Sequence, residues 1–257
     1  MNVSSLALFA LLLAPLSHPA FSQDSSARLS DVPVASTSDV PPSSTRDVPS
    51  VHFKKVDRNR SIYYKNKFEF SLQTGWLPNN IPFVFDFLVS SPYTQWPLHY
   101  TLVPNLASVR WQLDNIWGWK FLRGNTDFNF SANYTAIPRG PETRYFAFDY
   151  GIRRNFIQPN WWIVPYIEAM GGVGDINAKG PDGVLYAQGQ DLTFNLIVHS
   201  GLRYNFNPRF SMDAGVAYNH ISNFYLSEPK HEDFGINVYG PMVGLYMRLG
   251  KEKSVEK

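Results

Sequence analysis

A histidine and a serine stand two residues apart, at His220 and Ser222, within the stretch AYNHISNFYLSEPKHEDFGIN that runs from Ala217 to Asn237. If this stretch begins as a β-strand, both side chains lie on one face, with Cα atoms about 6.5 to 7 Å apart. The imidazole and the hydroxyl can then lean into hydrogen-bonding distance. A serine hydroxyl becomes a nucleophile when a base takes its proton, and histidine is the usual base near neutral pH. The pair therefore predicts a serine hydrolase that works by acyl transfer.

A third group has to hold the histidine in the tautomer that leaves Nε2 as a proton acceptor. Asn237 is the candidate, because it shares the parity of the apolar Tyr239 and Val243 in the next expected strand. His220 likewise shares the parity of the apolar Val216. If the apolar face meets lipid, the site meets lipid too, and it suits an acyl ester held in the membrane. The competing interpretation is that these are polar residues at the point where a strand leaves the membrane.

The strands that must position this pair are indicated by a long-range alternation of apolar and polar residues. In Gln190–Tyr204, Phe194 and Leu196 share one parity, whereas Asn195 and Arg203 share the other. Such a period of two is typical of a strand with one apolar and one polar face. The expected strands are Phe68–Trp76, Leu98–Leu113, Trp119–Tyr134, Thr143–Asn155, Trp161–Val173, Gln190–Tyr204, Arg209–His220 and a last one near the C-terminus from Tyr239 to Leu249.

These segments predict an all-β fold, an eight-stranded antiparallel transmembrane β-barrel. The strands are longer than the usual globular length of about 5 to 6 residues. A membrane barrel needs about 9 to 11 residues per crossing and leaves no unpaired edge in lipid. A soluble barrel of lipocalin type, with the apolar parity facing inward, is the alternative. Tryptophans at or near strand ends favour the membrane version; they are Trp76, Trp111, Trp117, Trp119, Trp161 and Trp162.

The chain divides into four predicted regions. Residues 1–22 fit a signal peptide, with an apolar core and a small-x-small cleavage pattern at Ala20-Phe21-Ser22. Residues 23–61 form a Ser/Pro/Asp-rich linker, expected to be disordered because it can bury little apolar area. The barrel domain spans 62–250, and a charged tail spans 251–257. The absence of cysteine excludes disulfides, and a net charge of +2 gives no electrostatic support to a nucleic-acid partner.

Other catalytic motifs are missing from the sequence. It contains no G-x-S-x-G elbow, no H-E-x-x-H zinc helix and no phosphate-binding glycine loop. His199 and Ser200 are adjacent, so on a strand they point to opposite faces and cannot pair. The chemistry is therefore assigned to the His220 stretch, with no metal and no cofactor.

That stretch carries a resemblance to a known family. HISN, a loop containing Glu-Pro, GIN at Gly235–Asn237 and a final strand resemble the lipid A 3-O-deacylase (PagL-like) family of outer-membrane barrels. Weaker similarity extends to YIEAMGGVG at Tyr166–Gly174 and to GLRYNF at Gly201–Phe206. The resemblance implies an eight-stranded barrel in the bacterial outer membrane, with its active site on the lipid-facing exterior. It implies removal of an ester-linked acyl chain, at the 3-O position, from lipid A or lipopolysaccharide. Membrane lipids would surround the barrel, and a homodimer is allowed.

Carried over residue by residue, Ser222 matches the nucleophile and His220 the base, while Asn223 matches the side chain implicated in oxyanion stabilisation. Asn237 stands where some members have a glutamate. An asparagine can orient a histidine but lacks the full charge that stabilises an imidazolium, so lower activity is expected. The acids that could replace it are Glu228, Glu232 and Asp233.

A second departure is that Phe224 and Tyr225 follow Asn223, where the family often has small residues. Their bulk is expected to alter substrate access. The competing hypothesis for the whole chain is a small outer-membrane barrel without enzymatic activity, serving structure or adhesion.

Overall fold

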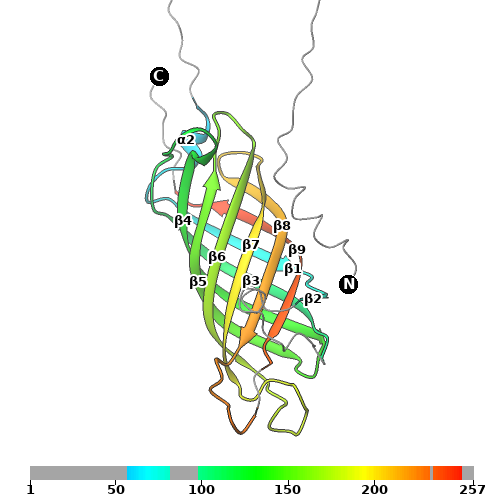
Figure 1. Cartoon of the computed structure of the whole chain (residues 1–257). Coiled ribbons are helices and arrows are strands. Elements are labelled where there is room, and N and C mark those ends of the chain that lie inside the picture. Colours follow the sequence, from blue (N-terminus) through cyan, green and yellow to red (C-terminus); the bar gives the residue numbers. More distant parts are fainter. Residues whose placement is uncertain (1–56, 82–97, 232–233, 251–257) are drawn as a thin grey trace, which may run out of the picture. The chain divides into compact units, whose positions relative to one another are not determined.

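The computed structural model describes residues 57–81, 98–231 and 234–250, and β-strands make up most of them (Figure 1). The long strands are β1 (Phe68–Gly75), β3 (Thr101–Gln112), β4 (Gly124–Arg139), β5 (Arg144–Phe156), β6 (Ile163–Ile176), β7 (Leu192–Asn205), β8 (Phe210–Ser222) and β9 (Ile236–Arg248). The short elements are helix α2 (Asn59–Ile62), the 3-10 helix η3 (Lys120–Leu122) and strand β2 (Asn79–Asn80). No helix within these described ranges is long and apolar enough to cross a membrane.

The sheet closes on itself, because β1 pairs with both β3 and β9. Every pairing in the sheet is antiparallel, and each long strand pairs with its sequence neighbours. The short strand β2 adds two residues beside β9. The predicted eight-stranded antiparallel barrel is confirmed, and each of the eight expected strands has a counterpart in the structure.

The two faces of the sheet differ sharply in polarity. On β1, Phe70 and Leu72 are exposed on the outer wall, whereas Glu69 and Ser71 are buried in the lumen. The other long strands repeat this alternation, with an apolar exterior. Their inward residues are polar over much of the barrel, but toward the end at which Ser222 lies they form an apolar cluster that includes Ile197, Ile221 and Met242. A membrane barrel presents such a wall to lipid, whereas a lipocalin-type barrel needs an apolar lumen. The soluble alternative is therefore wrong for this chain.

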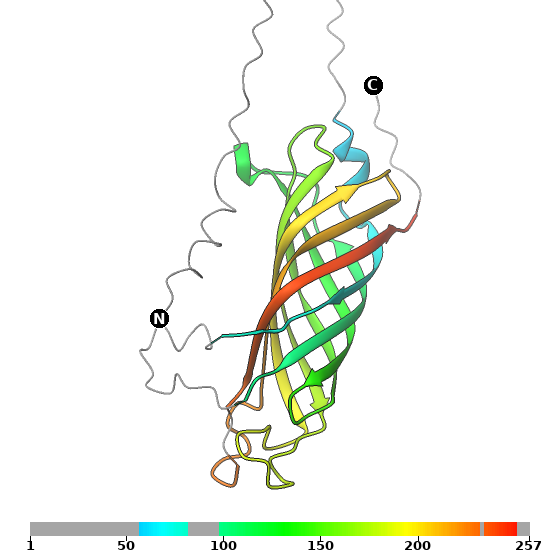
Figure 2. The same cartoon turned by 90° about the vertical axis from the view of Figure 1, so that its right-hand side faces the viewer.

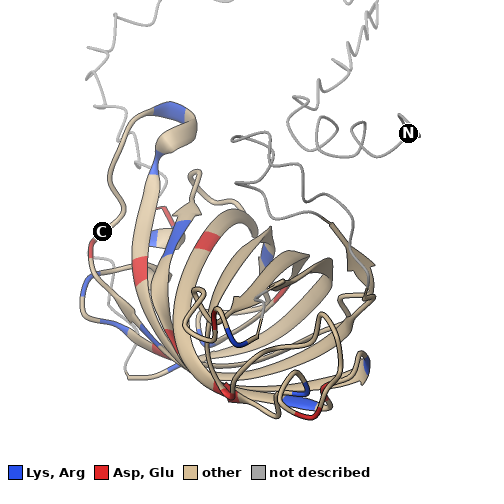
Figure 3. Cartoon of the chain, turned by 60° about the horizontal axis from the view of Figure 1, so that its bottom comes forward, with Lys and Arg blue, Asp and Glu red and all other residues tan. Residues whose placement is uncertain are grey.

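Ion pairs fill part of the lumen. Glu168 lies 2.7 Å from a guanidinium nitrogen of Arg110 and 2.8 Å from one of Arg153, and all three side chains are fully buried. Glu69 lies 3.1 Å from Arg203, which is equally buried. Figure 3 marks the acidic and basic positions along the barrel ribbon. Buried charges are tolerated when they are paired, so removal of one partner from this network would leave an uncompensated charge in the lumen.

The predicted strand Trp119–Tyr134 is wrong at both ends, because β4 runs from Gly124 to Arg139. The backbone is left-handed at Gly118, with φ of 101°, and at Lys120, with φ of 48°. Left-handed residues interrupt the extended geometry of a strand. Residues 119–123 therefore belong to the β3–β4 loop.

The described residues that contact the barrel begin before the predicted boundary at residue 62. The side-chain amide of Asn59 donates to the carbonyl oxygens of Gln158 and Trp161 at 2.8 and 3.1 Å, and Asp57 pairs with Arg123. Residues 57–61 of the predicted linker 23–61 therefore pack on the barrel, held by polar contacts that linker composition does not reveal. The predicted signal peptide 1–22, the rest of the linker and the predicted tail 251–257 lie outside the described residues.

We expect a chain that starts at Asp57 behind an added export signal to insert and unfold like the full chain. A chain that starts at Lys65 loses α2 and its hydrogen bonds, each of which contributes roughly 0.5–1.5 kcal/mol. Its unfolding midpoint in urea should fall, as followed by the heat-dependent shift of the folded band in gels. Equal midpoints for the two truncated chains would show that α2 contributes nothing.

The outer wall gives a second stability prediction. Phe130, near the middle of β4, is exposed at 49% and stacks on Phe148 of β5. We expect Phe130→Arg to destabilise the barrel by about 2–4 kcal/mol, the cost of a cation near the bilayer midplane. Leu185→Arg is the control, because Leu185 lies in the β6–β7 loop and is already 74% exposed. Urea titrations of barrels folded into vesicles measure both, and equal costs would contradict the membrane-facing assignment of the wall.

Candidate active site

The structure brings together the three side chains that the sequence singled out. His220 and Ser222 lie at the end of β8, and Asn237 lies at the start of β9 directly opposite His220 in the strand register. His220 Nε2 is 3.0 Å from Ser222 Oγ, and His220 Nδ1 is 2.8 Å from Asn237 Oδ1. Both distances lie in the range of about 2.6–3.2 Å that proton transfer requires. The geometry is that of a nucleophile, a base and a group that orients the base.

The hydrogen bond to Asn237 decides which tautomer His220 adopts. An amide oxygen only accepts hydrogen bonds, so the proton on His220 must reside on Nδ1 and point at Asn237 Oδ1. Nε2 is then an acceptor for the hydroxyl hydrogen of Ser222. This tautomer allows His220 to take the proton of Ser222 as a general base.

The site lies on the outer wall of the barrel, at the end from which the β8–β9 loop leaves. His220 and Ser222 share the outward parity of Val216. Across the strand pair, Phe194 and Leu196 of β7 are the neighbours of Ser222 and His220, respectively. Ser222 is only 7% exposed, so its hydroxyl lies in a partly covered, apolar surrounding. An ester with a long acyl chain fits that apolar surrounding better than a small water-soluble ester does.

Asn223, the predicted oxyanion residue, is fully buried next to Ser222. Its side-chain nitrogen donates to Ser227 Oγ at 2.8 Å, and Ser227 Oγ in turn donates to the carbonyl oxygen of His231. These bonds tie Asn223 into the β8–β9 loop. The side-chain nitrogen of Asn223 carries two hydrogens, and the bond to Ser227 uses one of them. The second would be the donor to an oxyanion, so the oxyanion role of Asn223 stays a prediction.

The two residues after Asn223 adopt an uncommon backbone. Phe224 and Tyr225 have φ angles of 52° and 61°, although neither is a glycine. Non-glycine residues in this region cost of order 1 kcal/mol or more each and cluster at functional sites. The turn brings the ring of Phe224 to 5.0 Å from that of Phe194, the cross-strand neighbour of Ser222. An aromatic pair therefore borders Ser222.

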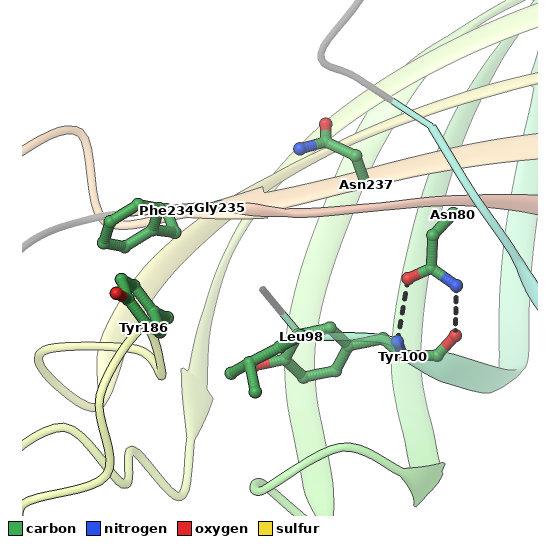
Figure 4. A pocket seen from close by; sticks show the side chains of 7 residues that line it. All are labelled: Asn80, Leu98, Tyr100, Tyr186, Phe234, Gly235 and Asn237. Atoms are coloured by element: carbon green, nitrogen blue, oxygen red, sulfur yellow. Dashed lines mark hydrogen bonds between the residues drawn. The ribbon is translucent and has the colours of Figure 1, made fainter. Parts of the chain in front are cut away.

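A small pocket opens on the β9 side of the site (Figure 4). It is lined by Asn80, Leu98, Tyr100, Tyr186, Phe234, Gly235 and Asn237. Asn80 shapes one wall, because its side chain exchanges two 2.8 Å hydrogen bonds with the backbone of Tyr100. Gly235 shapes another, since it has a left-handed φ of 57° and a Cβ there would come within 3.2 Å of His220 Cε1. The pocket thus reaches the residues that orient the base.

The acids that the sequence left open as alternatives to Asn237 are placed differently. Glu228 is exposed in the β8–β9 loop, where its backbone nitrogen donates to the Tyr225 carbonyl oxygen. Glu232 and Asp233 lie outside the described residues. Among the described residues, the group that meets His220 Nδ1 is Asn237.

Two residues of the site were missed by the sequence reasoning. Tyr218 donates a 2.7 Å hydrogen bond to Asn237 Oδ1, and Phe194 lies beside Ser222. The outward parity of Tyr218, two residues before His220, was a signal that could have identified it. Phe194 could not be found in this way, because its place depends on the register between β7 and β8.

Comparison with known proteins identifies the family. The family model for lipid A 3-O-deacylase (PagL) matches residues 105–246, more than half of the 257-residue chain. The chain belongs to the lipid A 3-O-deacylase family. The matched region contains Ser222, His220, Asn223 and Asn237. It covers β4 to β8 in full and most of β3 and β9. No curated protein matches the chain.

Solved structures of outer-membrane barrels are also similar to this chain. The crystal structure of the outer membrane enzyme PagL is 19% identical, with a TM-score of 0.46, and the match covers 70% of this chain and 99% of that one. Neisserial surface protein A is 14% identical, with a TM-score of 0.40, covering 71% and 97%. The attachment invasion locus protein Ail of Yersinia pestis is 13% identical, with a TM-score of 0.36, covering 72% and 99%.

Membership in the lipid A 3-O-deacylase family places the chain in the bacterial outer membrane. Barrels of that membrane have short periplasmic turns and longer extracellular loops. The connections at the end of the barrel at which Ser222 lies are 76–100, 140–143, 177–191 and 223–235, and those at the end that carries α2 are 113–123, 157–162 and 206–209 (Figures 1 and 2). Apart from the short turn 140–143, the connections at the Ser222 end are the longer ones, which favours the extracellular side for that end.

Proposed function

We propose that this chain removes the 3-O-linked acyl chain of lipid A by acyl transfer through Ser222. The observation that carries the proposal is the hydrogen-bonded series of Asn237, His220 and Ser222 on the outer wall. It is supported by the family, whose model is described as lipid A 3-O-deacylase. An ester that is anchored in the outer leaflet can meet Ser222 without leaving the membrane.

In the first half of the reaction, Ser222 Oγ attacks the ester carbonyl carbon while its proton passes to His220 Nε2. The carbonyl oxygen becomes an oxyanion, which Asn223 and a backbone N–H would stabilise. The bond between the carbonyl carbon and the sugar oxygen then breaks. His220 returns the proton to that oxygen, which leaves a sugar hydroxyl and an acyl group on Ser222.

In the second half, a water molecule attacks the acyl-serine and gives a proton to His220 Nε2. Collapse of the second oxyanion releases the fatty acid, and the proton returns to Ser222 Oγ. In this scheme every proton is taken up and returned by His220, so the proposed reaction requires no metal or cofactor. Asn237 keeps His220 oriented throughout, but its neutral amide stabilises the imidazolium less than a carboxylate would.

Mass spectrometry of lipid A tests the activity directly. Cells that express the chain should yield lipid A lacking one ester-linked acyl chain, and position-specific fragmentation should assign the loss to the 3-O position. Cells that express a folded Ser222→Ala variant should yield intact lipid A. An unchanged acyl count with the native chain would contradict the proposal and favour a barrel without enzymatic activity.

A further inference from the structure

One amide oxygen at the candidate site accepts two hydrogen bonds. Asn237 Oδ1 lies 2.8 Å from His220 Nδ1 and 2.7 Å from the hydroxyl of Tyr218. Tyr218 precedes His220 by two residues on β8 and points to the same outer face. Its direct cross-strand neighbour is Tyr239, so the hydroxyl reaches Asn237 diagonally along β9.

An asparagine poses a problem here that a glutamate does not. A carboxylate presents an acceptor oxygen to His220 in either orientation, whereas an amide has one acceptor end and one donor end. If the side-chain amide of Asn237 rotated by 180°, its NH2 group would face His220 Nδ1. The histidine proton would then move to Nε2, and His220 could no longer accept the proton of Ser222. The site therefore needs a device that fixes the orientation of this amide.

Tyr218 has the chemistry for that task. The lone pairs of a phenol oxygen are delocalised into the ring, so a phenol donates hydrogen bonds better than it accepts them. With Oδ1 toward Tyr218 and His220, the phenol acts as a donor. With the amide reversed, the phenol would have to accept from the NH2 group. Asn237 is only 3% exposed, so water cannot readily replace the lost donor.

We propose that Tyr218 is a positioning residue that holds the Asn237 amide in the orientation required for catalysis, so that Asn237 can orient His220 although it is not a carboxylate. The inference rests on the proposed function for its kinetic consequence, but the orientation of the amide is a property of the folded barrel itself. Tyr218 acts through Asn237 and His220, and it takes no part in bond making or breaking.

A set of variants tests the kinetic consequence on purified barrels in mixed micelles of lipid A and detergent. We expect Tyr218→Phe to lower kcat about fivefold with an unchanged KM, the factor that corresponds to one neutral hydrogen bond. Tyr150→Phe is the matched control, because Tyr150 is an outward tyrosine on β5, three strands away. It should leave kcat unchanged.

Double variants separate positioning from a direct or merely structural role. In an Asn237→Ala background, adding Tyr218→Phe should cause no further loss, because the amide to be oriented is gone. In an Asn237→Glu background the same change should alter kcat less than twofold, because a carboxylate needs no orienting partner. A constant fivefold loss in every background would overturn the inference.

Nitrogen-15 NMR of the histidine side chains gives a readout that is independent of activity. The signals of His220 are assigned by their loss in His220→Asn. In the native barrel His220 should carry its proton on Nδ1, and Tyr218→Phe should raise the population protonated on Nε2. An unchanged tautomer in Tyr218→Phe would overturn the inference even if the native chain deacylates lipid A. The expected tautomer shift in Tyr218→Phe, together with no deacylation by the native chain, would contradict the proposed function alone.

Discussion

Ser222→Ala is expected to abolish the release of fatty acid from lipid A, a fall of at least about 10³-fold in kcat. The reason is that the variant has no nucleophile to form the acyl intermediate, and the remaining groups can only polarise the ester. The barrel should stay intact, since the Ser222 hydroxyl bonds a neighbouring side chain at a strand end and supports no core packing. Fatty-acid release from purified lipid A, measured by mass spectrometry, gives the rate.

The same experiment tests whether the site works as a unit. His220→Asn should lose nearly as much activity as Ser222→Ala, and the double variant little more than either, because members of a catalytic unit are not additive. Ser200→Ala is the control, because Ser200 lies on the outer face of the adjacent strand β7, opposite Val216. It should retain the native rate. Full activity in Ser222→Ala would end the serine-hydrolase interpretation.

Glu168→Ala is expected to cause the largest loss of stability, about 3–5 kcal/mol in the free energy of unfolding. The change leaves Arg110 and Arg153 facing each other in the lumen without the carboxylate that lies between them. Two buried cations that lose their shared partner repel each other and cannot recover hydration. The midpoint of urea unfolding in vesicles measures the effect.

Asp182→Ala is the matched control for that variant. Asp182 also pairs with a cation, Lys179, at 2.9 Å, but the pair is exposed in the β6–β7 loop. Solvent screens such a pair, so the unfolding midpoint should stay within error of the native value. Similar losses for the two variants would mean that the lumen is hydrated well enough to screen its charges.

The fold could be predicted because the alternation of apolar and polar residues along a strand indicates which side chains face outward and which face the lumen. Alternation in Gln190–Tyr204 placed Phe194 outward and Arg203 inward, and the structure agrees. Local backbone breaks were harder to predict. The left-handed backbone at Gly118 and Lys120 makes β4 start at Gly124 and not at the predicted Trp119. The alternation of apolar and polar residues in that segment does not indicate this backbone conformation. The helix before β1 was missed because it is short and its contacts, both polar and apolar, reach residues about a hundred positions away.

The parts of the site that could be predicted are those that depend on one strand or on two neighbouring strands. The spacing of His220 and Ser222 follows from the period of one strand, and the parity of Asn237 follows from the next. Contacts across the barrel are different, since parity says that Arg110 and Glu168 face inward but not that they meet. That meeting depends on how four adjacent strands curve and stagger around the lumen, which no single segment encodes.

The position of Ser222 on the outside of a barrel whose interior is packed with side chains has a kinetic consequence. Substrate reaches such a site by diffusing sideways in two dimensions, so the quantity that sets the encounter rate is its mole fraction among neighbouring lipids. Diluting lipid A with inert detergent at constant bulk concentration should slow the enzyme, whereas adding water to the same mixed micelles should not. An outer leaflet crowded with lipid A would keep the enzyme near saturation, and its turnover would then depend on how quickly the product moves away.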